Sequence, residues 1–329
     1  MRVHSGSFLS ARVKERHNAF QAPRRRSHYR IFGCWLGYRH GAQHLSVGLV
    51  SNSGPDAWSL FWDEQGPGGR CLIFGDALDA LDEQWAYFAP VLPPGANVID
   101  VGCGAGTVGR NLLSHRNDLQ IIGIDSARVP SRSHPQLQVL SSVCMEALPF
   151  DDNSFDAAVS QFGIEYGKIL DTARELERVL KPGARFCFLV HHRDSELVRE
   201  GNIRRNALRA LISGPFKSAF LSGRLQELEQ QTRRLMKQYP RESMVKIVSD
   251  HYHRKIGCTR AQRQGICREV AEGLDPEIWM LLQLERCSMA ADHLGQWLVP
   301  LFSRMLVVGG SVVRRKSGEP IGWHIHGVR

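Results

Sequence analysis

Three patterns that would assign a chain to a protein class at once are missing from this sequence. Eight cysteines occur without a single C-x-x-C pair, which argues against a zinc site and a disulfide framework and favours a reducing compartment. No apolar run approaches the roughly 18 residues of a membrane-spanning helix. The basic segments lack the interleaved aromatic residues that stack nucleic-acid bases. These absences favour a cytoplasmic, globular protein without a membrane span, a metal site or a nucleic-acid partner.

Charge is unevenly divided along the chain. The 329 residues have a formal net charge of +9 and are 43% hydrophobic, which suits one large core or a core with an insert. The net charge is +8 over residues 1–46, −8 over 47–192, +8 over 193–260 and +1 over 261–329. The basic character therefore belongs to two local segments, which weakens an argument for nucleic-acid binding by the whole chain.

The first segment, residues 1–46, contains nine Arg or Lys residues and a single Glu, without sustained periodicity. This composition predicts a basic, disordered extension. Three interpretations compete: a transit peptide, a basic tail that touches anionic partners, or a start codon placed too far upstream. For a bacterial source we favour the last, because the first recognisable folded pattern begins later in the sequence.

A glycine-rich turn organises the rest of the chain. Residues 97–101 predict a strand, three glycines follow at alternate positions, and residues 107–113 begin a helix. Glycine suits such a turn because it allows unusual backbone angles and lets a ligand approach the bare backbone. The next predicted strand, residues 119–124, ends at Asp125, which lies 19 residues after Gly106. An acidic residue at about this distance is placed to hold ribose hydroxyls.

The identity of the ligand depends on Asp100. Gly104, Gly106 and Gly109 also satisfy the dinucleotide pattern G-x-G-x-x-G, so the turn alone leaves two classes of nucleotide ligand open. A carboxylate at Asp100, just before the glycines, would repel a pyrophosphate but could accept hydrogen bonds from an ammonium group. This favours S-adenosylmethionine, whose methionine end carries a cation.

Strands and helices alternate through the centre of the chain. Further strands are predicted at residues 137–143, 155–160 and 185–190, with a helix over residues 170–180 before the last of them. This alternation predicts a doubly wound α/β fold, in which a mostly parallel sheet is covered by helices on both faces.

The segments on either side are predicted to be helical. Residues 56–92 form two helical patterns with an aromatic stripe, which we interpret as core packing; the alternative is that Trp58 or Trp62 closes over the ligand. Residues 194–274 predict an insert of short helices.

The C-terminal part predicts a helix and a hairpin. Asp275 is expected to be an N-cap with Pro276 in the first helical position, opening a long helix that runs through Leu298. Residues 311–315 and 321–326 are expected to pair as a β-hairpin.

Taken together, these segments resemble the class I S-adenosylmethionine-dependent methyltransferases, in the group that includes the quinone-biosynthesis (type 11) enzymes. The resemblance covers about residues 95–192 and rests on Val98 to Gly106, Asp125, Glu146 to Phe150, Phe155 with Asp156, and Val179 to Gly183. It implies a seven-stranded Rossmann-like sheet, completed by a C-terminal antiparallel hairpin. It also implies a methyl-donor core over residues 47–193, a helical insert that acts as a substrate lid over 194–274, and a C-terminal helix and hairpin completing the core over 275–329.

Candidate site residues follow from the resemblance and from the rule that ligands lie beyond the carboxyl ends of parallel strands. In the family an Asp that binds the adenine amino group often occupies the position of Cys144, so here the Met145 backbone is the candidate for that contact. The candidates for a general base are His191, His192 and Glu165. The candidates for binding the donor are Asp100, Gly102, Cys103, Gly104, Gly106, Asp125, Ser126, Cys144, Met145, Ser160 and Gln161.

The leading hypothesis is an enzyme that uses S-adenosylmethionine to methylate a small-molecule or lipid-like acceptor by in-line displacement. One alternative is an NAD-dependent oxidoreductase that binds its cofactor with the same glycines. The other is a non-catalytic binding module on the same fold. The basic insert is interpreted either as a solvated helical surface or as a recognition surface for an acidic acceptor.

Overall fold

The computed structural model describes residues 55–67, 69, 75–130, 132 and 134–329, all within the compact unit 45–329. The expectations for residues 1–46 lie outside the described residues. The elements in chain order are α1 (Pro55–Gln65), α2 (Gly75–Phe88), η1 (Ala89–Val91), β1 (Asn97–Val101), α3 (Thr107–His115), β2 (Gln120–Asp125), β3 (Leu137–Ser141), β4 (Phe155–Gln161), η2 (Ile164–Tyr166), α4 (Ile169–Val179), β5 (Leu180–His191), α5 (Glu196–Ile212), α6 (Gly214–Ser222), α7 (Leu225–Gln238), α8 (Ser243–Lys255), α9 (Arg260–Cys287), α10 (Ala291–Phe302), β6 (Leu306–Arg314) and β7 (Pro320–Val328).

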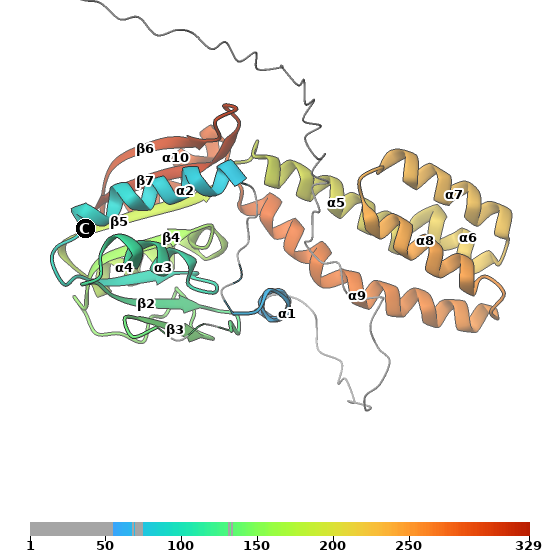
Figure 1. Ribbon diagram of the computed structural model, residues 1–329, viewed down its shortest axis with the longest axis horizontal. Helices are drawn as coiled ribbons and strands as arrows, with labels where there is room; N and C mark the ends of the chain where they lie inside the picture. Colours follow the sequence, from blue (N-terminus) through green and yellow to red (C-terminus); the bar gives the residue numbers. More distant parts are fainter. Residues whose placement is uncertain (1–54, 68, 70–74, 131, 133) are drawn as a thin grey trace, which may run out of the picture. The chain divides into compact units, whose positions relative to one another are not determined.

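Seven strands form one sheet in the order β3-β2-β1-β4-β5-β7-β6 (Figure 1). Strands β1 to β5 are parallel to one another, and β7 pairs antiparallel with both β5 and β6. The doubly wound, mostly parallel sheet and its C-terminal hairpin are therefore confirmed. Because β1 lies between β2 and β4, its carboxyl end is flanked by the ends of these two strands, where ligands of such sheets bind.

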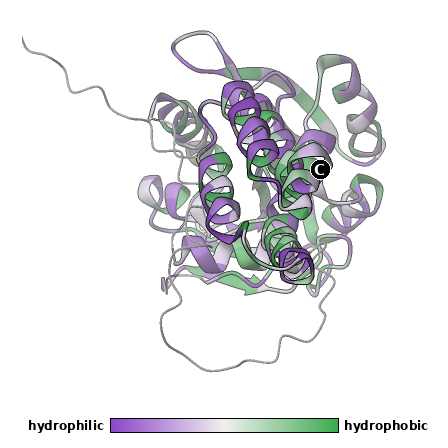
Figure 2. Cartoon of the chain, turned by 90° about the vertical axis from the view of Figure 1, so that its right-hand side faces the viewer, coloured by the Kyte–Doolittle hydropathy of each residue, from purple (hydrophilic) through white to green (hydrophobic). Residues whose placement is uncertain are grey.

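Two apolar layers bury the two faces of the sheet. Alternate residues of β1 face opposite layers, since Val98 packs in the layer that contains α2 and α3, whereas Ile99 packs in the layer that contains α4 and α10. Trp85 of α2 and Phe186 of β5 are among the largest fully buried side chains. Figure 2 shows the green of hydrophobic residues on the strands and a mixture of green and purple on the surrounding helices, as amphipathic helices require. The sheet edge that carries the glycine turn thus rests on a rigid core.

The helices α5 to α9 form a separate apolar cluster. Its members run from Ala207 to Leu274 and include Phe216, Phe220 and Tyr252, whose rings stack. A largely buried ion-pair group, in which Arg204 contacts Glu242 and Glu277, joins α5 to the start of α8 and to α9. This core of its own is consistent with the expected helical insert.

The expected helix start at Asp275 is wrong. The helix α9 begins at Arg260, where the Thr259 side chain accepts the Gln262 amide in a capping box, and continues through Pro276 to Cys287. A proline inside a helix costs about 3 kcal/mol or more, but α9 packs along α5 and this packing outweighs the local cost. The chain then leaves the helix around Met289, which pairs with the backbone of His191 and Arg193, so Leu298 belongs to a second helix, α10.

The capping box makes a testable prediction about the insert. Thr259→Ala should lower the free energy of unfolding by about 1 kcal/mol, because the Gln262 amide loses its hydrogen-bond acceptor. Thr259→Ser is the matched control, since it keeps the hydroxyl and should behave like the wild type. Urea denaturation followed by circular dichroism measures both variants, and equal stability of the Ala variant and the wild type would contradict the assigned helix start.

Candidate functional site

The turn after β1 is a left-handed glycine loop at the middle of the sheet edge. Gly102, Gly104 and Gly106 have φ values of +65°, +50° and +78°, a region that side-chain-bearing residues rarely adopt. A Cβ atom at Gly102 would lie 2.8 Å from the Cα of Gly163, in the turn after β4. Gly106 is the N-cap of α3. The positive φ values therefore favour glycine at all three positions, and the contact with Gly163 leaves no room for a side chain at Gly102.

The carboxylate of Asp125 closes the loop from the side of β2. One of its oxygens accepts the Gly104 amide and the other accepts the Ala127 amide, each at 2.9 Å. Burial raises the pKa of Asp125, and these two hydrogen bonds oppose the rise. Each carboxylate oxygen keeps a second acceptor site, so the pair can also receive ribose hydroxyls. Ser126 follows as an exposed residue.

Beneath the loop, Asp100 is a fully buried carboxylate. Neither of its oxygens has a hydrogen-bond partner in the described part of the chain. Burial raises the pKa of Asp100 to about 7 and the Asp125 carboxylate adds to the rise, whereas the Gly109 backbone and the positive charge of Arg110 oppose it. A buried acid that is only partly compensated is costly, and a further cationic group nearby would relieve that cost. The residues present thus fit a ligand that carries both a ribose and an ammonium group.

Three other donor-binding candidates use their polar groups inside the protein. The Cys103 amide donates to the carbonyl of Ile124 at 2.9 Å and so fastens the loop to β2. The Ser160 hydroxyl donates to the Val101 carbonyl at 2.7 Å and accepts the amide of Ile164 at 3.0 Å. The side-chain carbonyl of Gln161 accepts the indole N–H of Trp85 at 2.8 Å.

The loop after β3 brings the last two donor-binding candidates to the same edge. The Val143 amide donates to the backbone carbonyl of Asp125 at 3.0 Å, so the loop starts beside that residue. Cys144 is exposed, whereas Met145 is half-buried and packs close to Gly167. Backbone and side chain of Met145 therefore lie between the end of β3 and the turn after η2.

Glu165 is a buried acid in the turn after β4. One carboxylate oxygen accepts the backbone amide of His191 at 2.8 Å, and the other is buried without a partner among the described residues. Burial raises the pKa of Glu165 to about 8. A carboxyl group with this pKa is mostly protonated at neutral pH and exchanges its proton readily near that pH.

The two histidines at the end of β5 lie on opposite sides. The His191 ring stacks on Phe162 with 4.2 Å between ring centroids, and its Nδ1 is buried without a partner in the described structure. Burial lowers the pKa of His191 to about 3, which makes it a neutral and weakly basic group. His192 stacks on Trp323 instead, and its Nδ1 accepts the Asp194 amide at 3.1 Å.

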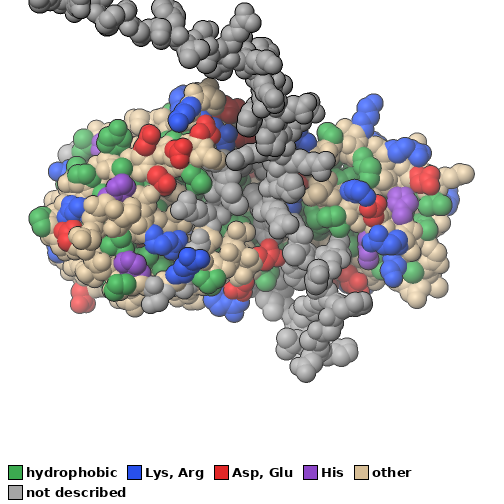
Figure 3. All heavy atoms as spheres, in the orientation of Figure 1, with side chains coloured by type: hydrophobic (Ala, Val, Ile, Leu, Met, Phe, Trp, Pro, Cys, Tyr) green, Lys and Arg blue, Asp and Glu red, His purple; other side chains and the backbone are tan. Residues whose placement is uncertain are grey.

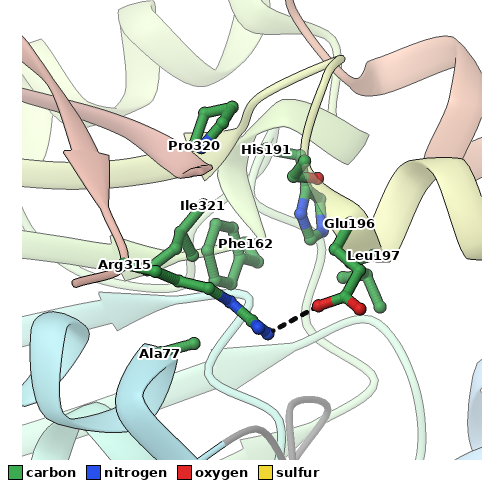
Figure 4. A pocket seen from close by; sticks show the side chains of 9 residues that line it. Ala77, Phe162, His191, Glu196, Leu197, Arg315, Pro320 and Ile321 are labelled. Atoms are coloured by element: carbon green, nitrogen blue, oxygen red, sulfur yellow. Dashed lines mark ion pairs between the residues drawn. The ribbon is translucent and has the colours of Figure 1, made fainter. Parts of the chain in front are cut away.

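A small pocket lies beside His191, between α2, the start of α5 and the β6–β7 turn (Figure 4). Phe162 and Ile321 supply apolar walls, and the Arg315 guanidinium pairs with Glu196 at 2.9 Å on one side. Phe162 has a φ of +56°, which is a strained conformation for an aromatic residue. The next residue, Gly163, packs against the backbone of the glycine loop. Phe162 lies within the segment from Ser160 to Tyr166, which the sequence places at the ligand edge of the sheet, but its stacking on His191 could not be read from the sequence.

The helix α1 also reaches the glycine loop. Trp62 is buried, and a Cβ atom at Gly104 would lie 2.3 Å from its Cζ2 atom. Core packing is the favoured interpretation of the aromatic stripe in the sequence, with closure of Trp58 or Trp62 over the ligand as the alternative, and the structure places the Trp62 indole against the loop.

Two absences hold for the residues with described positions. No group of three or more His, Cys, Asp or Glu side chains is arranged to hold a metal ion. None of the helices there is long and apolar enough to cross a membrane.

Comparison with known proteins gives the family of this site. Residues 99–188 match the family model of the methyltransferase domain. The chain is 35% identical over 115 residues to 24-methylenesterol C-methyltransferase 2 of Arabidopsis thaliana, covering 32% of each chain. It is 33% identical over 126 residues to the ubiquinone/menaquinone biosynthesis C-methyltransferase UbiE of Geobacter sp. (strain M21), covering 33% of this chain and 52% of that protein. The chain thus spans about a third to a half of the length of these relatives.

Solved structures give further matches. A putative methyltransferase of Haloferax volcanii in complex with the Trm112 activator is matched at 26% identity over 35% of this chain and 58% of that chain, with a TM-score of 0.30. A SAM-dependent methyltransferase from Aquifex aeolicus is matched at 14% identity over 77% and 89% of the two chains, with a TM-score of 0.38. The domain match over β1 to β5, together with the seven-stranded sheet, identifies this chain as one that carries a class I S-adenosylmethionine-dependent methyltransferase domain.

Proposed function

We propose that this protein transfers a methyl group from S-adenosylmethionine to a small-molecule or lipid-like acceptor. The observation that carries the proposal is the hydrogen bond from the Gly104 amide to Asp125, because it joins the bare glycine loop to the carboxylate suited to ribose. The buried Asp100 carboxylate lies in β1, two residues before Gly102. A dinucleotide would bring a pyrophosphate toward this acid, so the same arrangement disfavours an NAD-dependent oxidoreductase.

Positioning is the main contribution that these residues make. The bound donor supplies a methyl group that is already activated on a sulfonium. Asp125 and the glycine loop hold the nucleoside end, and Asp100 favours the ammonium at the other end. Fixed orientation of two reactants can contribute roughly 7 to 11 kcal/mol to lowering a barrier. The residues at the ends of β1, β2 and β4 are therefore proposed to act by positioning, without forming a covalent bond to either reactant.

Among the three candidate bases, Glu165 is best suited to move a proton. Its pKa of about 8 lies close to neutral pH, and its second carboxylate oxygen has no protein partner within the described structure. His191 is a weak base, because burial lowers its pKa to about 3, and we assign it hydrogen bonding at the pocket wall. His192 packs on Trp323 and is assigned a structural role.

The acceptor is proposed to lie between the pocket beside His191 and the helical insert, which would act as a lid. The relatives named above are methyltransferases of a sterol and of quinone biosynthesis, which supports a lipid-like acceptor. Figure 3 shows the basic side chains of the insert interspersed with acidic ones, and several are ion-paired, as Arg224 is with Glu227. This distribution supports a solvated surface over a nucleic-acid-binding patch.

Isothermal titration calorimetry tests the donor assignment. The wild type should bind S-adenosylmethionine and S-adenosylhomocysteine but not NADH. Gly104→Ala should weaken both affinities at least tenfold, because the added Cβ atom meets Trp62 and a φ of +50° is strained for a residue with a side chain. An intact fold with no binding of either adenosyl compound would overturn the proposal, and binding of NADH alone would select the oxidoreductase.

Asp125→Asn provides a second test of the same site. An amide replaces one acceptor oxygen with a donor, so the Gly104 or Ala127 amide loses its partner, and affinity for S-adenosylhomocysteine should fall about tenfold. Asp118→Asn is the matched control, since this exposed carboxylate precedes β2 at the opposite end of the strand. Equal affinities for the two variants would contradict the assigned role of Asp125.

The raised pKa of Glu165 predicts a pH effect on stability. Between the ordinary value of 4.5 and about 8, the carboxyl is protonated in the folded state and ionised in the unfolded state, so unfolding releases a proton and stability falls as pH rises. From pH 5 to 8 the wild type should lose on the order of 3 kcal/mol more than Glu165→Gln in urea denaturation. The control Glu229→Gln, in an exposed ion pair, should follow the wild type. Parallel profiles of wild type and Glu165→Gln would refute the shift.

A further inference from the structure

We propose that Trp62 on α1 contacts the methyl donor and distinguishes the cationic donor from its neutral product. This inference rests on the proposed function and goes beyond it, because it assigns a specificity-determining residue outside the strand ends. It depends on where α1 is anchored, on what the indole touches, and on the chemical difference between the two adenosyl compounds.

The helix α1 spans the donor site from the ribose side to the acceptor side. On the ribose side, the Arg128 amide donates to the Ser59 hydroxyl at 2.9 Å, and the Arg128 guanidinium pairs with Asp63 at 2.5 Å. Arg128 lies three residues after Asp125. On the acceptor side, Trp58 contacts Tyr166 of η2, edge to face, with 5.2 Å between ring centroids. A ligand held by the glycine loop and Asp125 would therefore lie beneath this helix.

Within α1, Trp62 is the side chain that reaches the glycine loop. Only 7% of its surface is exposed, and Phe61 supports it edge to face with a centroid distance of 4.9 Å. The three nearest atoms to a Cβ built at Gly104 all belong to this indole, at 2.3 to 3.1 Å. The absence of a side chain at Gly104 thus makes room for the indole as well as for a ligand, and the indole must lift when a ligand occupies that place.

The chemistry of the donor places its charge at this point. The sulfonium joins the ribose to the methionine chain, so it must lie between the ribose-binding Asp125 and the ammonium-binding end near Asp100. Gly104 lies at the ribose end of that interval, because its amide is hydrogen-bonded to Asp125. The face of an indole attracts a cation, whereas the thioether that remains after methyl transfer is neutral. Trp62 would therefore favour the donor over the product and assist product release.

Calorimetry with S-adenosylmethionine and S-adenosylhomocysteine tests this role without knowledge of the acceptor. Trp62→Leu keeps an apolar side chain but removes the aromatic face, so the preference for the donor over the product should fall about three- to thirtyfold. Trp62→Phe should retain most of the preference. Leu60→Ala is the matched control on the same helix, because Leu60 is an exposed residue of α1, and it should leave the ratio of the two affinities unchanged.

Three outcomes separate this inference from the proposed function. A wild type that binds neither compound would overturn both. A wild type that binds both, with a Trp62→Leu variant that loses affinity for the two compounds equally or not at all, would overturn the role of Trp62 alone. Should Trp62→Leu fail to fold by circular dichroism, Trp62→Met decides the question with Trp62→Phe as its aromatic counterpart. A lower preference for the donor in Trp62→Met than in Trp62→Phe supports the inference, and equal preferences in these two variants contradict it.

Discussion

The structure depends on close backbone contact at the carboxyl end of β1. On one side Asp125 accepts the Gly104 amide, and on the other Gly102 lies against Gly163 with no space for a side chain between them. Ser160 adds a hydrogen bond from β4 to the last residue of β1. These contacts fix the ends of three neighbouring strands relative to one another, so that any ligand meets a preorganised edge.

Three ionisable side chains at the same edge have polar atoms without a hydrogen-bond partner among the described residues. Asp100, Glu165 and His191 are buried, and each has a side-chain polar atom without a partner among the described residues. Their pKa values move toward the neutral form of each group, as desolvation requires. A folded protein seldom tolerates three such groups together unless a ligand or a reaction uses them. Their clustering supports a functional site independently of the glycine pattern.

Local patterns were sufficient to predict the sheet. Buried parallel strands appear as short β-branched runs, and the glycine turn and the acid of Asp125 stand at fixed distances along the sequence, so β1 to β5 and their parallel pairing could be predicted. The path of α9 through Pro276 could not, because proline and Asp275 form a good local helix start, and only packing on α5 overrides it. The left-handed Phe162 and the contact of Trp62 with Gly104 also depend on tertiary proximity. Such tertiary contacts cannot be predicted from the local periodicity of the sequence.

The position of α1 links the donor edge to the helical insert. In addition to its contacts with the glycine loop, α1 packs against α9, and α9 in turn packs against η2, which carries Glu165. A displacement of α1 would therefore alter packing contacts at the glycine loop and at the insert. Through α9 it would also alter contacts at the turn that holds the candidate base, Glu165. Because the insert is proposed to close over the acceptor, binding of the donor and closure of the acceptor site would both involve contacts of α1. Coupling of this kind needs no long pathway, since each link is a direct packing contact between two elements.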